Sequence, residues 1–164
     1  METEFDRILR EHFQARPMAQ KILLDRFPDL DHSHLEAAYE IAQDLLRHKK
    51  YDDAESVFYF LAMMDHFERR YWKALAVTLW VQKKYKDALG VYLAAFFLDP
   101  MDIEVVAAMA DCCLAMGDRE GAKEFLEQTC EIFEIEGKRG DLARRAKVFL
   151  EMIEQKNGEK NGKS

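Results

Sequence analysis

A period of 34 residues constrains this chain more than any other feature of its sequence. Three segments align on one alanine column at that spacing: YDDAESVF (51–58), YKDALGVY (85–92) and REGAKEFL (119–126). Small residues also stand twelve positions before this column, so that two columns contain Ala42, Ala76 and Ala110, and Ala54, Ala88 and Ala122. Such a period is typical of arrays in which one small motif stacks on the next. The units span residues 35–68, 69–102 and 103–136.

Each unit is expected to be a pair of helices. Only three prolines and seven glycines punctuate the 164 residues, which argues against many short strands. The predicted pairs are 34–48 with 52–64, 67–82 with 86–98, and 102–116 with 119–136, with turns at 49–50, 83–84 and 117–118. Three helix starts are predicted from capping patterns, namely Ser33 with Glu36, Asp65 with Glu68, and Asp99 before Pro100.

The second unit resembles the tetratricopeptide repeat. It has suitable residues where that family has Trp, Leu, Gly, Tyr, Ala, Phe, Ala and Pro, namely Trp72, Leu75, Ala76, Tyr85, Ala88, Tyr92, Ala95 and Pro100. The first and third units depart at the Trp and Pro positions. The resemblance implies an all-α fold with three tetratricopeptide repeats stacked as a short superhelix.

Two flanking segments are expected to cover the ends of the stack. Residues 1–30 are predicted to be a helical segment with apolar stripes, and residues 141–155 a C-terminal capping helix that begins at Asp141 and whose Arg144, Arg145 and Lys147 form a solvated face. The polar residues 156–164 are expected to be disordered. The apolar stripe of the capping helix contains Leu142, Ala146, Phe149, Leu150 and Ile153.

Composition and charge exclude several classes of protein. The net charge is −7, with −11 in residues 1–136 and +4 in residues 137–164, which disfavours nucleic acid as the main partner. No apolar run approaches the length that spans a bilayer, and the charged start of the chain does not resemble a signal peptide, so a cytoplasmic protein without membrane insertion is expected. Three cysteines, of which Cys112 and Cys113 are adjacent, argue against a disulfide framework.

Signals for catalysis or cofactors are weak. The chain has no phosphate-binding loop, dinucleotide fingerprint, nucleophile elbow or zinc-protease motif. His32 and His34 beside Asp31 fit helix capping better than a metal site, and Cys112 and Cys113 are expected to be packing residues. We therefore expect no enzyme, no metal and no cofactor. The eight methionines fit either an adaptable peptide-binding surface or core filling, and the sequence leaves both open.

A concave binding surface is the remaining candidate for function. The first helix of each pair lines the concave side of such arrays, with Glu36, Tyr39, Gln43 and Leu46, then Arg70, Lys73, Val77 and Trp80, then Glu104, Ala107, Asp111 and Leu114 in the inward positions. Tyr39, Leu46, Val77 and Trp80 are large apolar groups that repeat packing does not require. A strip of this kind, flanked by Arg70, Lys73 and Asp111, suits an extended peptide.

Residues 35–96 resemble the class II chaperones of bacterial type III secretion systems. The shared motifs are LExxY (35–39), KYDDAxxVF (50–58) and LAMMDHFERRYW (61–72). The resemblance implies a non-catalytic bacterial cytoplasmic chaperone that binds an extended N-terminal segment of hydrophobic translocator proteins and keeps them soluble before export. It also implies that Phe58, Leu61 and Met64 floor the pockets, and it allows a homodimer through the N-terminal region.

The alternative is a tetratricopeptide scaffold that joins two proteins. Recognition of a C-terminal carboxylate by such a scaffold would require several Lys, Arg and Asn side chains at inward positions, where this chain has only Arg70 and Lys73 as cations. The predicted peptide-binding residues are Tyr39, Gln43, Leu46, Phe58, Leu61, Met64, Lys73, Val77 and Trp80.

Overall fold

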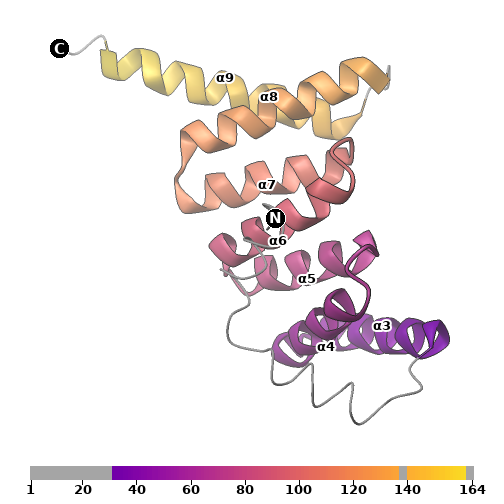
Figure 1. Ribbon diagram of the computed structural model, residues 1–164. Helices are drawn as coiled ribbons and strands as arrows, with labels where there is room; N and C mark the ends of the chain where they lie inside the picture. Colours follow the sequence, from indigo (N-terminus) through magenta and orange to yellow (C-terminus); the bar gives the residue numbers. More distant parts are fainter. Residues whose placement is uncertain (1–30, 137–139, 162–164) are drawn as a thin grey trace, which may run out of the picture. The chain divides into compact units, whose positions relative to one another are not determined.

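A computed structural model describes residues 31–136 and 140–161, which form seven helices (Figure 1). None of these residues lies in a strand, so the predicted all-α class is confirmed. The segment at 1–30, together with any homodimer contact through it, lies outside the described residues. The helices are α3 (His32–Arg47), α4 (Tyr51–Met64), α5 (Arg69–Val81), α6 (Tyr85–Leu98), α7 (Ile103–Met116), α8 (Arg119–Glu136) and α9 (Asp141–Asn161).

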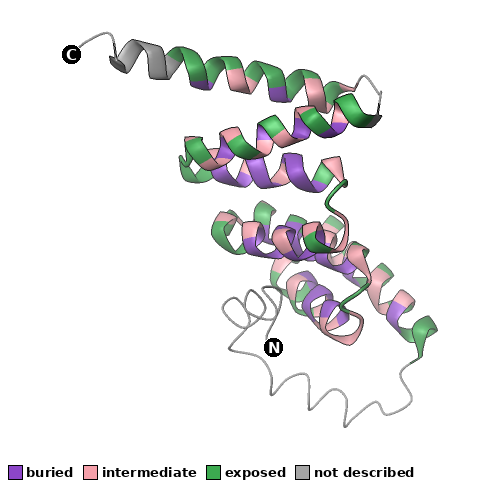
Figure 2. Ribbon diagram, turned by 45° about the horizontal axis from the view of Figure 1, so that its top comes forward, coloured by how far each residue is buried: buried purple, intermediate pink, exposed green. Residues whose placement is uncertain are grey.

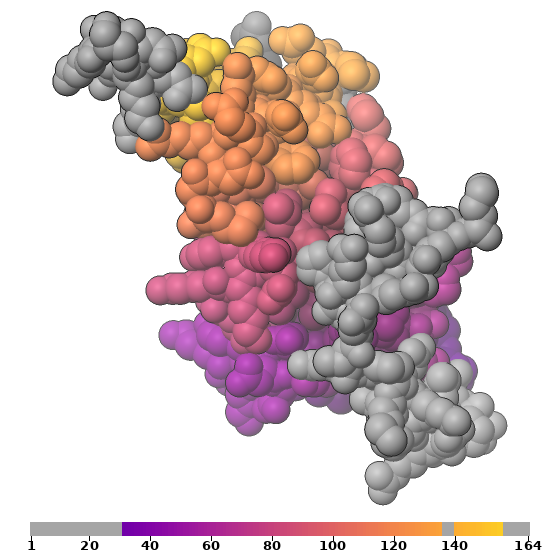
Figure 3. Space-filling model, turned by 60° about the vertical axis from the view of Figure 1, so that its left-hand side comes forward, coloured from indigo at the N-terminus to yellow at the C-terminus, as the bar shows by residue number. Residues whose placement is uncertain are grey.

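The chain divides into two compact units, Met1–Leu98 and Asp99–Ser164, called here the N-terminal and C-terminal units. In the N-terminal unit α3 pairs with α4 and α5 with α6, while α4 and α3 also contact α5. The surface of the first pair, indigo to purple, passes directly into that of the second pair (Figure 3). In the C-terminal unit α8 lies against both α7 and α9. The three predicted repeats are thus distributed between two units, with the division after α6.

Small residues at the helix contacts explain the pairing. All six alanines of the two repeat columns are completely buried, and a larger side chain there would separate the paired helices. Figure 2 shows the buried residues concentrated where helices of one unit face each other. The residues directly before Ala42, Ala76 and Ala110 differ in burial, since 59% of the surface of Ile41 is exposed whereas Leu75 and Met109 are buried.

The three turns between paired helices share one geometry. Lys49, Lys83 and Gly117, each 34 residues from the next, adopt left-handed backbone conformations with φ of 61°, 62° and 80°. The following amide donates to the carbonyl five residues earlier, as Lys84 does to Leu79 at 3.0 Å, which closes a Schellman motif. The predicted turns are therefore confirmed. Only the third has the glycine that this conformation favours.

The predicted cap of the first helix is wrong by two residues. Asp31, not Ser33, is the N-cap of this helix. Its carboxylate accepts a hydrogen bond from the His34 amide at 3.1 Å, and the His34 ring accepts one from the Asp31 amide. The Ser33 hydroxyl donates to the same carboxylate at 2.6 Å. This bond, followed by that from the His34 amide, lowers the pKa of Asp31 to about 2. An aspartate two residues upstream thus outcompetes the serine because it can accept both donors.

Two further caps differ in the same manner from those predicted. Glu68, expected as the partner of Asp65, is itself the N-cap of α5 and accepts from the Arg70 amide at 3.0 Å. Asp102 caps α7, accepting from the amides of Glu104 and Val105. Asp99 instead accepts from the Met101 amide within the preceding turn, so Pro100 precedes the helix rather than opening it.

The last helix is longer than its apolar stripe indicated. Ala146 and Ile153 of that stripe are buried, and Asp141 lies in the first turn. The helix then continues to Asn161, so residues 156–161, expected to be disordered, extend it. No proline interrupts this stretch, and its Glu and Lys residues favour a helix.

The left-handed turn position is shared by the repeats, so removing a glycine there in one repeat and introducing one in another should have opposite effects on the free energy of unfolding. Gly117→Ala should lower the free energy of unfolding by about 1 kcal/mol, because no atom crowds the site and the cost comes from the backbone alone. Lys83→Gly should cause no loss and a gain of up to about 1 kcal/mol, since it relieves the same strain. Urea denaturation of both variants measures this. An equal loss in both would contradict the explanation.

Candidate functional site

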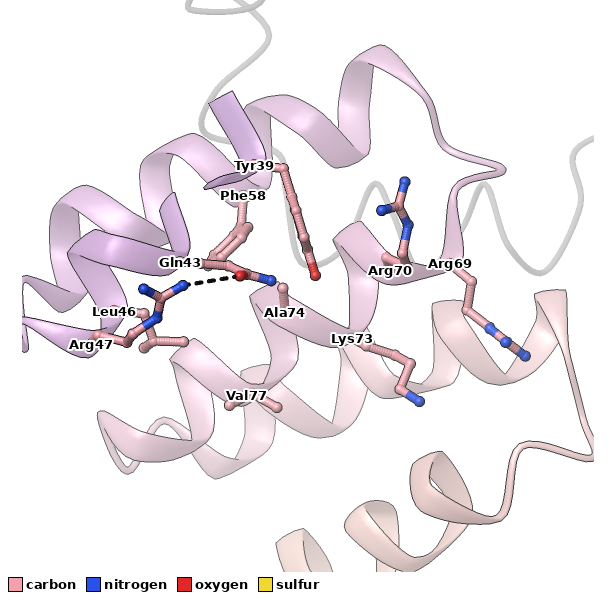
Figure 4. A pocket seen from close by; sticks show the side chains of 10 residues that line it. All are labelled: Tyr39, Gln43, Leu46, Arg47, Phe58, Arg69, Arg70, Lys73, Ala74 and Val77. Carbon is pink, nitrogen blue, oxygen red and sulfur yellow. Dashed lines mark hydrogen bonds between the residues drawn. The ribbon is translucent and has the colours of Figure 1, made fainter. Parts of the chain in front are cut away.

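The candidate site is a cavity of about 380 Å³ in the N-terminal unit, bounded by α3, α4 and α5 (Figure 4). Its floor is apolar, with Leu46, Phe58, Ala74 and Val77, while polar and charged side chains surround it. A volume near the lower end of ligand pockets suits one or two side chains of a longer ligand. The lining residues are Tyr39, Gln43, Leu46, Arg47, Phe58, Arg69, Arg70, Lys73, Ala74 and Val77.

The structure brings six of the nine predicted site residues together at this cavity. They are Tyr39, Gln43, Leu46, Phe58, Lys73 and Val77. Leu61 does not line it, and its side chain is completely buried in the core. Met64 at the end of α4 is also absent from the lining. Trp80 is 40% exposed on α5, with its ring edge-on to Tyr85 at 6.2 Å, and lies outside this pocket.

Aromatic packing fixes Tyr39 at the cavity. Its ring meets Phe58 in an edge contact at 5.7 Å between centroids and lies 5.5 Å from the ring of Tyr71. Phe58 and Tyr71 are both fully buried, so they act as a rigid support for the half-buried Tyr39. The position of Tyr39 at this site therefore depends on the core beneath it. Replacing it with alanine would remove core packing as well as pocket surface.

Arg70 is the electrostatic centre of the site. Its guanidinium contacts Glu36 at 2.6 Å and Glu68 at 3.0 Å, and its Cζ lies 5.3 Å from the Tyr39 ring centroid. The Arg70 hydrogen bond is the main cause that lowers the pKa of both Glu36 and Glu68. Glu36 and Arg70 are 34 residues apart, so the pair joins equivalent positions of the first two repeats. Arg70 thereby ties α3 to α5 across the site.

Sequence reasoning missed Arg47, Arg69 and Ala74 as lining residues. Arg47 follows the predicted Leu46 directly, and it pairs with Asp44 at 2.5 Å and Gln43 at 3.4 Å. Arg69 stands four residues before the predicted Lys73 and so shares its helix face. Extending each predicted position by one helical turn would have identified these cations.

One inward residue of the third repeat has a partner within the C-terminal unit. Asp111 forms an ion pair with Arg145 of α9, within the C-terminal unit. Arg144, Arg145 and Lys147 are all exposed, as the predicted solvated face requires, and the pairing of Arg145 with a carboxylate of α7 is an addition to that prediction. Arg144 pairs with Asp141 at 3.4 Å.

The cysteines and His34 have structural roles. Cys112 and Cys113 are buried as predicted, and burial raises the pKa of all three thiols, that of Cys112 to about 12. Such thiols are poor nucleophiles at neutral pH. His34 belongs to the capping box of α3. In the part of the chain that the structure covers, no three His, Cys, Asp or Glu side chains gather as a metal site would require.

Two properties of the surface complete the description. Across the described helices, none combines the length and apolar character needed to cross a membrane. Exposed apolar side chains include Val77 at the cavity and Val148 on α9, with 41% and 50% of their surface exposed.

The comparisons with known proteins agree with this geometry. Residues 71–102 match the tetratricopeptide repeat model. Low calcium response locus protein H of Yersinia pestis is 26% identical over 122 residues, which cover 74% of this chain and 73% of that protein. Chaperone protein SicA of Salmonella typhimurium is 28% identical over 119 residues, covering 73% and 70%.

A solved structure extends the likeness to three dimensions. PcrH of Pseudomonas aeruginosa, in complex with the chaperone binding region of PopD, has a TM-score of 0.72 and 26% identity over 79% of this chain and 97% of its own. The type III secretion translocator chaperone SycD of Yersinia enterocolitica has a TM-score of 0.71 and 25% identity over 79% of this chain and 98% of its own, so the homologues include type III secretion chaperones. The resemblance proposed from the sequence motifs is thus confirmed.

The Arg70 cluster predicts a pH dependence of stability. In Arg70→Gln, the pKa of Glu36 and Glu68 should rise toward the ordinary value of 4.5. Because both pKa values are lowered in the folded protein, the stabilisation is present above 4.5 and is lost as the pH falls through the folded-state values. The stability difference between wild type and variant should therefore shrink in acid. Carboxyl NMR titration and urea denaturation at neutral and acid pH measure these effects.

Lys86→Gln is the matched control, since it removes one exposed cation of the same unit outside the cavity. It should leave the titration of Glu36 unchanged. If Glu36 titrated at the same pH in the wild type and in Arg70→Gln, the role assigned to Arg70 would be incorrect.

Proposed function

We propose that this chain is a cytoplasmic bacterial chaperone of a type III secretion system. It binds an extended segment near the N-terminus of hydrophobic translocator proteins and keeps these proteins soluble and apart until export. It performs no catalysis and needs no cofactor. The observation that carries the proposal is the apolar-floored cavity at inward positions of the first two repeats, in a chain whose homologues are chaperones of this class.

The cavity has the properties that a client segment requires. Leu46, Phe58 and Val77 offer apolar surface to a side chain of the segment, and the open surroundings leave its backbone accessible. A structure of PcrH with the chaperone binding region of PopB, 27% identical with a TM-score of 0.68, likewise pairs a protein of this shape with a translocator segment. We infer that Tyr39, Gln43, Leu46, Phe58, Lys73 and Val77 contact the client here.

A moderate affinity suits this function. Burying two or three leucine or valine side chains contributes about 1.5 to 3 kcal/mol each. Ordering the segment and restricting its motion offset part of that contribution. Because a dissociation constant of 1 μM corresponds to about 8.2 kcal/mol, the remainder gives binding no tighter than about micromolar, which an export apparatus overcomes easily. The acidic surface that dominates the chain keeps the complex in solution.

Val77→Asp is the sharpest test of the groove. Val77 is exposed on α5, so the substitution leaves the core intact and places a charge against the apolar anchor of the client. We expect at least about tenfold weaker binding, because a hydrated carboxylate replaces the apolar surface against which the client anchor packs. The variant is co-expressed with a translocator that has a hydrophobic segment, and the fraction of this client in the supernatant is measured. Client should move to the pellet.

Val148→Asp is the matched control. It makes the same substitution at a comparably exposed valine on α9, in the C-terminal unit. Both variants should give the helical circular dichroism spectrum of the wild type, and only Val148→Asp should retain the client. Retention by Val77→Asp to the same extent would eliminate the cavity as the client site.

A further inference from the structure

A second hollow, of about 340 Å³, lies along α3 and the turn that follows it, and is called here the α3 slot. None of its lining residues lines the candidate site. Ile41 has 59% of its surface exposed, and Leu45, four positions later on the same helix face, is half-buried. Two large apolar residues in this arrangement fit burial against another helix. The lining residues are Ile41, Asp44, Leu45, His48 and Lys50.

The second repeat shows what fills the equivalent place. The residues 34 positions after those of the α3 slot are Leu75, Thr78, Leu79, Gln82 and Lys84. The first three of them are buried. Gln82 and Lys84 donate hydrogen bonds to Glu55 of α4, at 2.9 and 2.7 Å. The α3 slot is therefore the surface on which a helix that precedes α3 would pack, as α4 packs on α5.

Residues 18–27 have the apolar pattern that this surface requires. Leu24 and Phe27 stand 34 positions before Phe58 and Leu61, whose side chains are completely buried on α4. Equivalent residues of stacked repeats occupy equivalent environments. A helix over residues 18–27 would thus present Leu24 and Phe27 to the α3 slot.

The connection to α3 has the same length as the connection between α4 and α5. Pro28 follows Phe27 directly, and a helix usually ends at or before the residue that precedes a proline. A helix that ends at residue 27 lies four positions before Asp31, the N-cap of α3. The last residue of α4, Met64, likewise lies four positions before Glu68, the N-cap of α5.

We propose that residues 18–27 form a helix that packs in the α3 slot of their own chain, with Leu24 and Phe27 against Ile41 and Leu45. The short connection favours the same chain over a second copy, because it holds the segment beside the slot at a high effective concentration. This assignment does not depend on the proposed function.

The polar link between α4 and α5 has no counterpart here. Lys21 stands in the place of Glu55, so the segment offers no carboxylate to the basic residues His48 and Lys50. Apolar contact must therefore hold the segment. Ile41→Lys should release it, because the variant loses the apolar surface and adds a cation to a place that already contains several.

A helix in the α3 slot also bears on the candidate site. α3 supplies Tyr39, Gln43 and Leu46 to that site, and Ile41 and Leu45 to the slot. The segment thus holds in place the helix that forms one wall of the cavity, although no residue of the slot lines the cavity. It is a positioning element for the site.

Chemical cross-linking tests which chain fills the slot. Lys21→Cys is combined with His48→Cys in the full chain, and the protein is treated with a short bismaleimide. These positions correspond to Glu55 and Gln82, whose side chains meet at 2.9 Å. Denaturing electrophoresis and mass spectrometry of the peptides distinguish a link within one molecule from a link between two. The wild type, treated in parallel, reports the reaction of the native cysteines.

We expect a link within one molecule, formed at least about tenfold faster than in the matched control. The control combines Lys21→Cys with Lys86→Cys, since Lys86 is an exposed residue of α6 outside the slot.

Hydrogen exchange read by mass spectrometry tests the contact without introduced thiols. In the wild type, amides of residues 18–27 should exchange at least about tenfold more slowly than in an unstructured chain, and Ile41→Lys should remove this protection. Ile135→Lys is the matched control, because Ile135 is 74% exposed on α8 in the C-terminal unit. It should leave the protection unchanged, and both variants should keep the helical circular dichroism spectrum.

Three results would overturn this assignment. Exchange of residues 18–27 at the unstructured rate in the wild type would mean that they do not fill the slot. Links formed only between molecules would assign the slot to a second copy. Protection that persists in Ile41→Lys would mean that the segment packs elsewhere. None of these results bears on the candidate site, because no client is present in either experiment.

Discussion

The close approach of paired helices at two columns of alanine is the contact on which the remainder of the structure depends. Because these six side chains are completely buried, the helices of each pair meet with little space between them. That contact fixes which faces point outward, so Tyr39 of α3 and Val77 of α5 arrive at one cavity although 38 positions separate them. A larger residue in either column would move the helices and with them the walls of the site.

The site is built in layers of decreasing rigidity. The buried rings of Phe58 and Tyr71 support Tyr39. The Arg70 guanidinium lies over the face of the Tyr39 ring and joins the first two repeats through its ion pair with Glu36. The exposed Val77 lies beyond this frame. Such an arrangement allows different client segments to be accommodated at the surface without disturbing the core, which suits a chaperone for more than one translocator.

The 34-residue period made most of the fold predictable from sequence, because equivalent residues of the three repeats occupy the same kind of environment. Ala42, Ala76 and Ala110 show this, and so does the left-handed turn position. The caps were less predictable, since Asp31 and Asp102 compete with nearby serine or aspartate residues and only the local geometry decides between them. The ion pair of Arg145 was missed for another reason: its partner Asp111 lies on a different helix, outside any local pattern.

The turns at Lys49 and Lys83 have a consequence for handling the protein. Each presents two consecutive exposed lysines in a strained backbone conformation, which is the type of site that trypsin attacks first in a folded chain. Both cleavage points fall between the helices of a pair rather than between pairs. The fragments of a cleaved molecule would thus stay associated through their buried alanine contacts. They would remain together under native conditions and separate only on a denaturing gel.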